Sequence, residues 1–544
     1  MSNQIKNRLS WAYAVTKGFR WNLVLYMLLD TISTILMLYF VYCSKQAIDI
    51  ALQVIPGNLR LELIHLALSI VISVMMSLAS MWISEYVKNE MTIRLQKNLA
   101  HSQIMVTWKG INQFYSGDLM VRLDTDCVEV VHTLVYIIPS FILIGIRLAA
   151  AFLLLWTFDP SLAKIILAFT PLFILSRIFY RRMRRITKET KDAESRLGNI
   201  LQENIEYRSL IQALSITEVR EKKYTDTQQL LLRKKIQQLN LATLRQGILR
   251  FIYNGGYLLT FLWGIYRLHY GYISYGTMAA YLQLIGRVQV PVISMMSVIS
   301  AVVRFRTAIE RLMELNDGER EVYANPVKLK SPLTLKIHQL SYRYNEKDVI
   351  NNFNMECRTG ISTAITGASG KGKTTLIRLI LAVIKPDSGS MTLTQEDSGE
   401  IHEITVDTRN NMAYVPQGNT MFTGTIRENL IVAYTMASDE HIHEVLRIAC
   451  AEFVYSLPKG LDTVIGELGI GISEGQAQRL AVARTLLRED SSIWLFDEFT
   501  SALDMDTIHR IFRNILIAAK DKMLIFVTHD NYIIDRCSQV VKLD

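Results

Sequence analysis

The chain has 544 residues, of which 50% are hydrophobic and 20% are charged, and its mean hydropathy is +0.20. Soluble proteins of this length usually carry more charge, so the composition predicts a membrane portion. The five cysteines have no CxxC spacing, so they indicate neither a zinc site nor a disulfide framework. The net charge of +9 is typical of a protein that binds either nucleic acid or a membrane surface. The positions of the basic residues distinguish these two possibilities.

The first 22 residues lack the short apolar core and the small-residue cleavage site of a secretory signal. Their mixture of aromatic and basic side chains predicts an amphipathic helix on the inner membrane surface, with a frayed terminus as the alternative. These side chains are Trp11, Tyr13, Phe19 and Trp21, together with Lys6, Arg8, Lys17 and Arg20.

Apolar segments long enough to cross a bilayer come next along the chain. Residues 63–84 are the clearest, because all 22 positions are uncharged. Residues 133–180 are interpreted as a hairpin that turns at "FDPS". The six predicted spans are residues 21–44, 63–84, 133–158, 161–180, 251–266 and 274–303.

Basic residues are distributed unevenly among the loops between these spans. Residues 85–132 hold five Lys or Arg and residues 181–250 hold sixteen, whereas the three loops on the other side hold three in total. This asymmetry follows the positive-inside rule and predicts that both termini lie in the cytosol. The basic excess is therefore a topology signal, which argues against a nucleic-acid-binding protein. We expect helices to fold back through both inner loops.

The composition changes after Leu312. Residues 313–332 are charged, carry two prolines and are interpreted as a linker between a membrane domain, residues 1–312, and a second domain, residues 333–544. In the second domain, short apolar strands alternate with helical patterns, which predicts a parallel sheet covered by helices. The predicted strands include "ISTAIT" at 361–366, "SIWLF" at 492–496 and "MLIFV" at 523–527.

The segment "GASGKGKTT", Gly367 to Thr375, fits the phosphate-binding pattern G-x-x-x-x-G-K-[ST]. It follows a predicted strand and opens an apolar helix, as the pattern requires; a glycine-rich turn is the alternative. Its glycines let backbone amides surround phosphates at the start of a helix. Lys373 is expected to reach the β- and γ-phosphates, and the Thr374 hydroxyl to bind Mg²⁺.

Two adjacent acidic residues end the predicted strand "IWLFDE". The Asp497 carboxylate is placed to hold Mg²⁺ through water, and Glu498 to orient or deprotonate an attacking water. In isolation, a helix cap or a surface turn would explain this pair equally well.

With these two motifs the chain resembles the ATP-binding cassette (ABC) family. The resemblance continues in the family's order with "SYRY" at 341–344, "YVPQ" with Gln417, "ISEGQ" at 472–476, "SALD" at 501–504 and "VTHD" with His529. The resemblance implies an α/β RecA-like cassette with a helical subdomain. It also implies a multidomain membrane protein with a six-helix α transmembrane domain, because "FYSGDLMVRLDTD" at 114–126 and the segment that begins at Gly271 resemble parts of ABC exporters.

The family pattern implies a role for each matching residue. Glu498, His529 and Gln417 would be catalytic, and Thr374, Gln417 and Asp497 would hold Mg²⁺. Tyr344 would stack on adenine. ATP would be bound by Tyr344, Gly367, Ala368, Ser369, Gly370, Lys371, Gly372, Lys373, Thr374 and Thr375 of one cassette, and by Ser473, Gly475, Gln476 and Asp504 of another.

One chain has one cassette, so the resemblance implies a dimer with two ATP sites at its interface. A homodimer is favoured, since one chain carries every element; a heterodimer is the alternative. Helix ends near 114–124 and 211–222 are the candidates for contact with the cassettes.

Two features depart from the family pattern. Glu474 stands in "ISEGQ" where the family usually has glycine, and the chain stops soon after His529 without the usual terminal helical segment. Since Ser473 and Gly475 are kept, we expect a functional signature with weakened cassette closure.

The sequence therefore predicts an ATP-driven exporter in the plasma (inner) membrane, with its cassette in the cytosol. A membrane receptor or channel regulator that binds ATP with little turnover is the alternative, but Glu498 and His529 argue against it. An importer is a further alternative. The cargo stays open among lipid, drug-like compound and peptide. Because no peptidase precedes the first span, we expect no trimming of peptide leaders.

Charged residues also occur within or near the predicted spans, where charge is costly and usually faces protein or a wet cavity. Asp30 and Arg147 are each about midway along a span and could form an ion pair. Facing the substrate is the alternative role, and the excess of arginine hints at an acidic group on the cargo. The four residues are Asp30, Arg147, Arg177 and Arg287.

Overall fold

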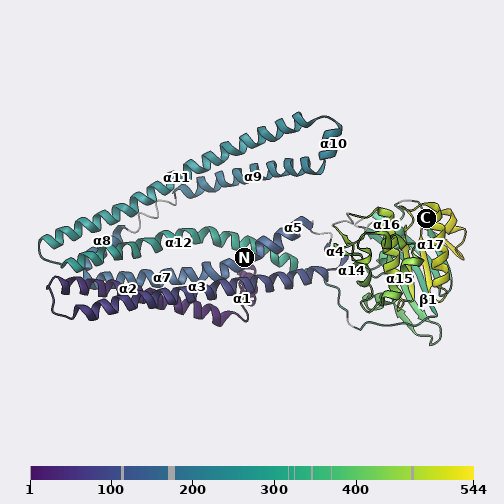
Figure 1. Ribbon diagram of the computed structural model, residues 1–544, viewed down its shortest axis with the longest axis horizontal. Coiled ribbons are helices and arrows are strands. Elements are labelled where there is room, and N and C mark those ends of the chain that lie inside the picture. Colours follow the sequence, from purple (N-terminus) through teal and green to yellow (C-terminus); the bar gives the residue numbers. More distant parts are fainter. Residues whose placement is uncertain are drawn as a thin grey trace. The chain divides into compact units, whose positions relative to one another are not determined.

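The computed structural model divides the chain into two compact units (Figure 1). One comprises Met1–Ala100 and Ser116–Asn316, and the other comprises His101–Tyr115 and Asp317–Asp544. Arg177 and Ser369 lie outside the described residues. The structure describes residues 2–111, 116–169, 178–316, 318–323, 325–344, 347–368, 370–418, 420–466 and 471–543.

The first unit is helical, as expected from long apolar runs and from inner loops rich in helix-forming residues. Two π-helical turns, η1 (Arg122–Asp126) and η2 (Thr133–Ile137), lie between its shorter helices. The helices are α1 (Ser2–Val15), α2 (Arg20–Ala51), α3 (Leu59–Ile104), α5 (Ser116–Val121), α6 (Cys127–His132), α7 (Ile138–Phe158), α8 (Pro160–Phe169), α9 (Ile178–Glu206), α10 (Arg208–Ala213), α11 (Thr217–His269) and α12 (Tyr275–Asn316).

Three helical segments of the described chain are long and apolar enough to cross a membrane. They are Arg20–Ala51, Leu59–Ile104 and Gly117–Phe158. The predicted span at 251–266 falls within α11, that at 274–303 lies in α12 except for Ser274, and that at 161–180 begins in α8. The membrane domain is therefore helical, while its count of six spans stays a prediction.

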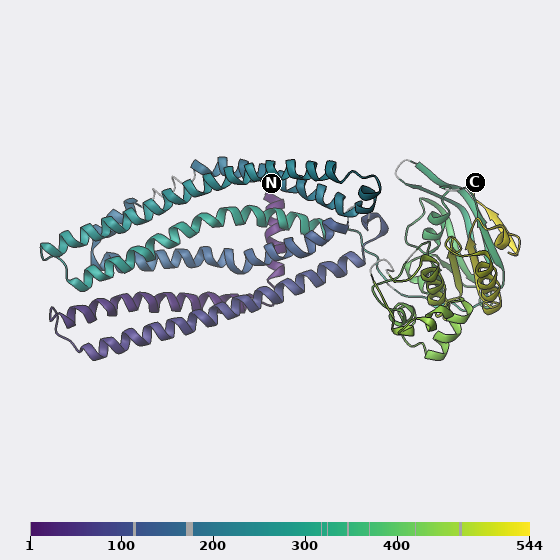
Figure 2. The same ribbon diagram turned by 45° about the horizontal axis from the view of Figure 1, so that its top comes forward.

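The basic inner loop between residues 181 and 250 forms a long helical pair. Helices α9 and α11 run side by side in both views (Figures 1 and 2). Ion pairs connect them: Lys234 Nζ lies 2.7 Å from Glu189 Oε2, and Arg220 Nη2 lies 2.8 Å from Glu203 Oε2. The predicted fold-back of this loop is thus observed.

Asp159 fixes the turn between α7 and α8. It is 1% exposed and accepts hydrogen bonds from the backbone N–H groups of Ser161 and Leu162, which caps α8. Its other carboxylate oxygen accepts from Trp263 Nε1 and Tyr281 Oη, both at 3.1 Å. One buried carboxylate therefore joins α7 and α8 to α11 and α12.

The second unit contains the α/β domain. A parallel sheet has the strand order β11-β3-β10-β9-β6, and an antiparallel sheet has the order β2-β1-β4-β5. The predicted strands at 361–366, 492–496 and 523–527 correspond to β3, β9 and β10. The strands are β1 (Leu333–Tyr344), β2 (Lys347–Arg358), β3 (Ser362–Thr366), β4 (Ser388–Gln395), β5 (Ile401–Glu403), β6 (Met412–Val415), β7 (Gly424–Thr425), β8 (Val464–Ile465), β9 (Ile493–Asp497), β10 (Met523–Val527) and β11 (Gln539–Lys542).

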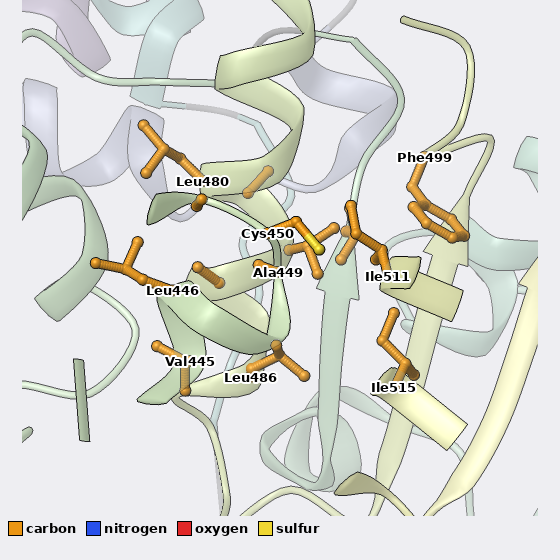
Figure 3. Packing of buried hydrophobic residues seen from close by; sticks show 14 of the residues in the cluster. Val445, Leu446, Ala449, Cys450, Leu480, Leu486, Phe499, Ile511 and Ile515 are labelled. Atoms are coloured by element: carbon orange, nitrogen blue, oxygen red, sulfur yellow. The ribbon is translucent and has the colours of Figure 1, made fainter. Parts of the chain in front are cut away.

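Helices cover the parallel sheet and enclose two apolar cores. On one side, α15, α16 and α17 pack around residues such as Leu446, Leu480 and Ile511 (Figure 3). On the other side, α13 packs between the two sheets with Leu376 and Ile380 fully buried. The helices are α4 (Trp108–Ile111), α13 (Lys373–Ile380), α14 (Ile426–Ile431), α15 (Asp439–Ile448), α16 (Glu474–Leu486), α17 (Met505–Ala518) and α18 (Asn531–Ile534).

Candidate nucleotide-binding site

The loop between β3 and α13 has the backbone geometry of a phosphate cradle. Gly372, the residue before α13, has φ +93°. A Cβ there would lie 2.8 Å from Val349 Cγ1, so only glycine fits. Gly367 is similarly confined, because a Cβ would lie 2.5 Å from the Leu543 carbonyl oxygen. The predicted strand, loop and helix are therefore found in that order.

Lys373 lies at the centre of this loop and is 6% exposed. Its Nζ donates to the carbonyl oxygen of Gly367 at 2.8 Å and to that of Ala368 at 3.3 Å. It also lies 2.7 Å from His529 Nε2 and 4.0 Å from Glu498 Oε1. A buried ammonium group enclosed by acceptors at a helix start suits an incoming phosphate.

Asp497 ends β9 as a buried carboxylate. Its Oδ1 is buried and has no hydrogen-bond partner among the described residues, while Oδ2 accepts from the Tyr414 hydroxyl at 3.3 Å. Burial and the adjacent Glu498 raise the pKa of this carboxyl to about 6. A buried carboxylate oxygen without a hydrogen-bond partner fits a hard cation such as Mg²⁺, which prefers oxygen ligands.

Glu498 follows Asp497 with an unusual backbone conformation, φ +44°. Its Oε2 accepts from Gln417 Nε2 at 2.7 Å, and its Oε1 lies 3.6 Å from His529 Nε2. Left-handed backbone at a non-glycine residue costs energy and is often found at functional sites. Gln417 and His529, two of the three predicted catalytic residues, therefore lie beside the carboxylate of the third, Glu498, which is also close to Lys373.

Tyr344 belongs to a contact that motif reasoning did not find. Its hydroxyl accepts from Arg378 Nη1 at 3.2 Å, and the Arg378 guanidinium lies over the Trp108 ring at 4.3 Å. Trp108 belongs to residues 101–111, which lie in the same compact unit as the cassette, and Val106 of this segment forms a β-bridge with Arg320 of the 313–332 linker. In the predicted contact segment 114–124, residues 114 and 115 lie outside the described residues. Contact of this segment and of residues 211–222 with the cassettes stays a prediction. The sequence signal that could have revealed this contact is the aromatic Trp108 within the polar inner loop at 85–132.

The signature segment is arranged as a helix start. Ser473 caps α16: its hydroxyl accepts from the Gln476 N–H at 3.2 Å, and Gln476 Oε1 accepts from the Ser473 N–H at 2.9 Å. Asp504 caps α17 by accepting from the Thr507 N–H at 2.9 Å, and this bond lowers the pKa of the Asp504 carboxyl. Gly475 is packed so closely that a Cβ would lie 2.5 Å from the Ala502 carbonyl oxygen.

The predicted site residues therefore form two groups within the chain. The loop 367–375, Gln417, Asp497, Glu498 and His529 lie at the ends of neighbouring strands, as the parallel sheet requires. Among the described residues, no hydrogen bond connects Ser473, Gly475, Gln476 or Asp504 to that loop. Within the chain, Ser473, Gln476 and Asp504 serve as helix caps, and Gly475 is a position of close packing.

Two regions of the chain match ABC families. Residues 23–292 match the ABC transporter transmembrane region, and residues 350–501 match the ABC transporter family. A Rickettsia typhi protein named as an export ATP-binding/permease protein is 26% identical over 513 residues, covering 89% of this chain and 84% of the relative. A Staphylococcus aureus protein named as a multidrug export ATP-binding/permease protein is 24% identical over 472 residues, covering 85% and 81%.

A solved structure shares the fold. A bacterial Atm1-family ABC exporter with ATP bound superposes with a TM-score of 0.78 at 20% identity, covering 97% of this chain and 94% of that one. The cradle at 367–375 and the unpaired carboxylate oxygen of Asp497 fit ATP and Mg²⁺, the cofactors of this ATPase family. Bound Mg²⁺ would neutralise charge that develops on the phosphates. The chain belongs to the ABC transporter family, as an exporter half-transporter that couples ATP hydrolysis to transport across a membrane.

Proposed function

We propose that two identical copies of this chain form the working exporter. Each ATP site would combine residues 367–375 of one copy with Ser473, Gly475, Gln476 and Asp504 of the other. The support is that one chain carries every motif that the two ATP sites need. In a heterodimer, these motifs could be divided between two different chains. A heterodimer is the alternative assembly.

Within each site, Glu498 would act as the general base that takes a proton from the attacking water. Gln417 donates to Glu498 Oε2, so it would hold that carboxylate and help bind Mg²⁺ with Thr374 and Asp497. His529 lies 2.7 Å from Lys373 Nζ and would contact the γ-phosphate beside this lysine. Tyr344 would stack on adenine, and its hydrogen bond to Arg378 would relay nucleotide binding to Trp108.

The distribution of Lys and Arg among the loops supports a plasma (inner) membrane location with the termini and cassette in the cytosol. Cargo would cross the helical domain. That domain contains a cavity of about 530 Å³, within the size range of small-molecule sites. Helices α2, α3, α7 and α12 contribute its lining, which includes Ser33, Thr34, Ser77, Gln283 and Pro291.

We infer that the cargo carries an acidic group, and Arg287 is the observation that supports this. Arg147 in the same cavity is paired, since its Nη2 donates to Asp30 Oδ1 at 2.8 Å and to Oδ2 at 2.5 Å. This confirms the predicted ion pair. Arg287 also lines the cavity, but its Nη2 donates to the Met37 sulfur at 3.8 Å, and it has no carboxylate partner among the described residues. An unpaired cation within a predicted membrane span favours an anionic ligand.

The experiment compares Arg287→Gln with wild type, each purified and reconstituted in lipid nanodiscs. The stimulants are organic carboxylates and their uncharged methyl esters, and the readout is ATP hydrolysis. A charged hydrogen bond contributes ~1.5–3 kcal/mol, so the substitution should raise the half-maximal carboxylate concentration by ~10–150-fold. Esters should act equally on both proteins.

Arg245→Gln is the matched control, because Arg245 is exposed on α11 and does not line the cavity. Its carboxylate response should equal that of wild type. If carboxylates stimulate Arg287→Gln as strongly as wild type, Arg287 does not bind the cargo. If esters stimulate wild type as well as acids do, the cargo is not selected by charge.

A further inference from the structure

A thiol, a carboxyl and an imidazole meet where helices α2 and α3 approach the turn that joins them. Cys43 lies on α2, and Glu62 and His65 lie on the first turns of α3. One potential ligand atom from each residue lies within 4.8 Å of the other two. Glu62 and His65 are three residues apart and therefore share one face of α3, with His65 Nδ1 4.0 Å from Glu62 Oε2.

We propose that these three side chains form a binding site for a borderline divalent cation of the Zn²⁺ type. Thiolate, imidazole and carboxylate are the ligand types that Zn²⁺ takes, and three protein ligands leave a fourth position for water or another group. Hard cations such as Mg²⁺ and Ca²⁺ prefer oxygen ligands only, so the Cys43 sulfur selects against them.

The three ligand atoms must move slightly closer together to bind the ion. In a tetrahedral Zn²⁺ site, metal–ligand bonds of about 2.0–2.3 Å place neighbouring ligand atoms about 3.4–3.6 Å apart. The separations here, up to 4.8 Å, must therefore shorten by about 1 Å. The side chains of Glu62 and His65 can make this movement, because they are 22% and 37% exposed and their ion-pair contact is with each other.

Burial gives the site an inner and an outer side. Cys43 is 1% exposed, whereas the two residues on α3 are partly open to solvent. An ion would therefore enter past His65 and Glu62 and reach the sulfur last. The ring of Tyr39, one helical turn from Cys43, lies 6.3 Å from the His65 ring and covers one flank of the cluster.

An ion here would connect two membrane helices that the chain joins only by residues 52–58. Side-chain hydrogen bonds between these helices join Ser33 to Ser73, and Ser80 to the Tyr26 carbonyl oxygen. A metal bridge near the turn would oppose separation of α2 from α3. We therefore expect bound Zn²⁺ to slow any transport cycle that requires these helices to move apart.

The 544-residue chain in lipid nanodiscs, titrated with Co²⁺, tests the site directly. Bound Co²⁺ should produce a thiolate-to-cobalt charge-transfer band that one equivalent of Zn²⁺ removes. Cys43→Ser should abolish the band, and His65→Gln should weaken Co²⁺ binding at least tenfold. His65 is partly exposed, so its substitution preserves the fold even if Cys43→Ser does not.

Cys537→Ser is the matched control, because Cys537 is the partly exposed cysteine of the other unit. It should keep the full band, and Zn²⁺ should slow ATP hydrolysis in this control but not in His65→Gln. The proposal is wrong if wild type gives no thiolate band, or if Cys43→Ser and wild type bind Co²⁺ equally. This outcome does not depend on the cargo, so it leaves the inference from Arg287 untouched.

Discussion

Gly475 offers a test of how the signature segment works. A Cβ at this position would lie 2.5 Å from the Ala502 carbonyl oxygen, whereas ordinary contact begins at 3.4 Å. In Gly475→Ala, α16 and the 501–504 segment must therefore separate by about 0.9 Å, and overpacking of this kind costs ~1–3 kcal/mol. The better helix propensity of alanine returns only ~1 kcal/mol.

The shift should affect catalysis more than folding. It displaces Ser473 and Gln476, which would face ATP bound by the partner copy, and a misplacement of ~1 Å can cost ~10²-fold in rate. We expect ATP turnover in nanodiscs to fall ~10–100-fold, while binding of ATP to each cassette stays near the wild-type value.

Glu474→Ala is the control, since Glu474 is exposed and adjacent to Gly475. It should keep turnover near that of wild type. If Gly475→Ala also hydrolyses ATP within about twofold of wild type with an unchanged melting temperature, the close approach to Ala502 does not position the signature.

Glu474→Gly should keep turnover and tighten apparent ATP affinity by up to about tenfold, because an opposing charge ~8 Å from the γ-phosphate costs ~0.5–2 kcal/mol; a weaker affinity would contradict this. Ser473→Arg should stop turnover by blocking the interface, and normal hydrolysis would mean that this segment is no signature. Lys373→Ala should impair ATP binding itself, since it removes the buried ammonium group beside Gly367, which an equilibrium binding measurement would show.

The cassette was largely predictable, because its chemistry depends on local sequence. A strand, a glycine loop and a helix are adjacent in the chain, so the phosphate-binding loop at 367–375 could be predicted from the sequence alone. Asp497 and Glu498 follow a buried apolar strand that a parallel sheet places beside that loop. The predicted helical pair of the inner loop was also found in α9 and α11.

Contacts between distant segments could not be predicted in the same way. The Asp159 hydrogen bonds to Trp263 and Tyr281 connect residues more than a hundred positions apart. The cluster of Cys43, Glu62 and His65 has no zinc-type spacing, and it forms only because α2 and α3 fold back on each other. The close approach of Gly475 to Ala502 likewise depends on tertiary packing.

ATP hydrolysis by Glu498→Gln tests the central claim most directly. The substitution keeps the shape of the side chain but removes the base, and loss of a positioned base costs ~10²–10⁴ in rate. The measurement is single-turnover hydrolysis by the purified 544-residue chain in nanodiscs, alongside retention of bound ATP. We predict that hydrolysis falls by at least ~10² while ATP stays bound. Turnover within about threefold of wild type would contradict the account, because Glu498 would then not activate the attacking water.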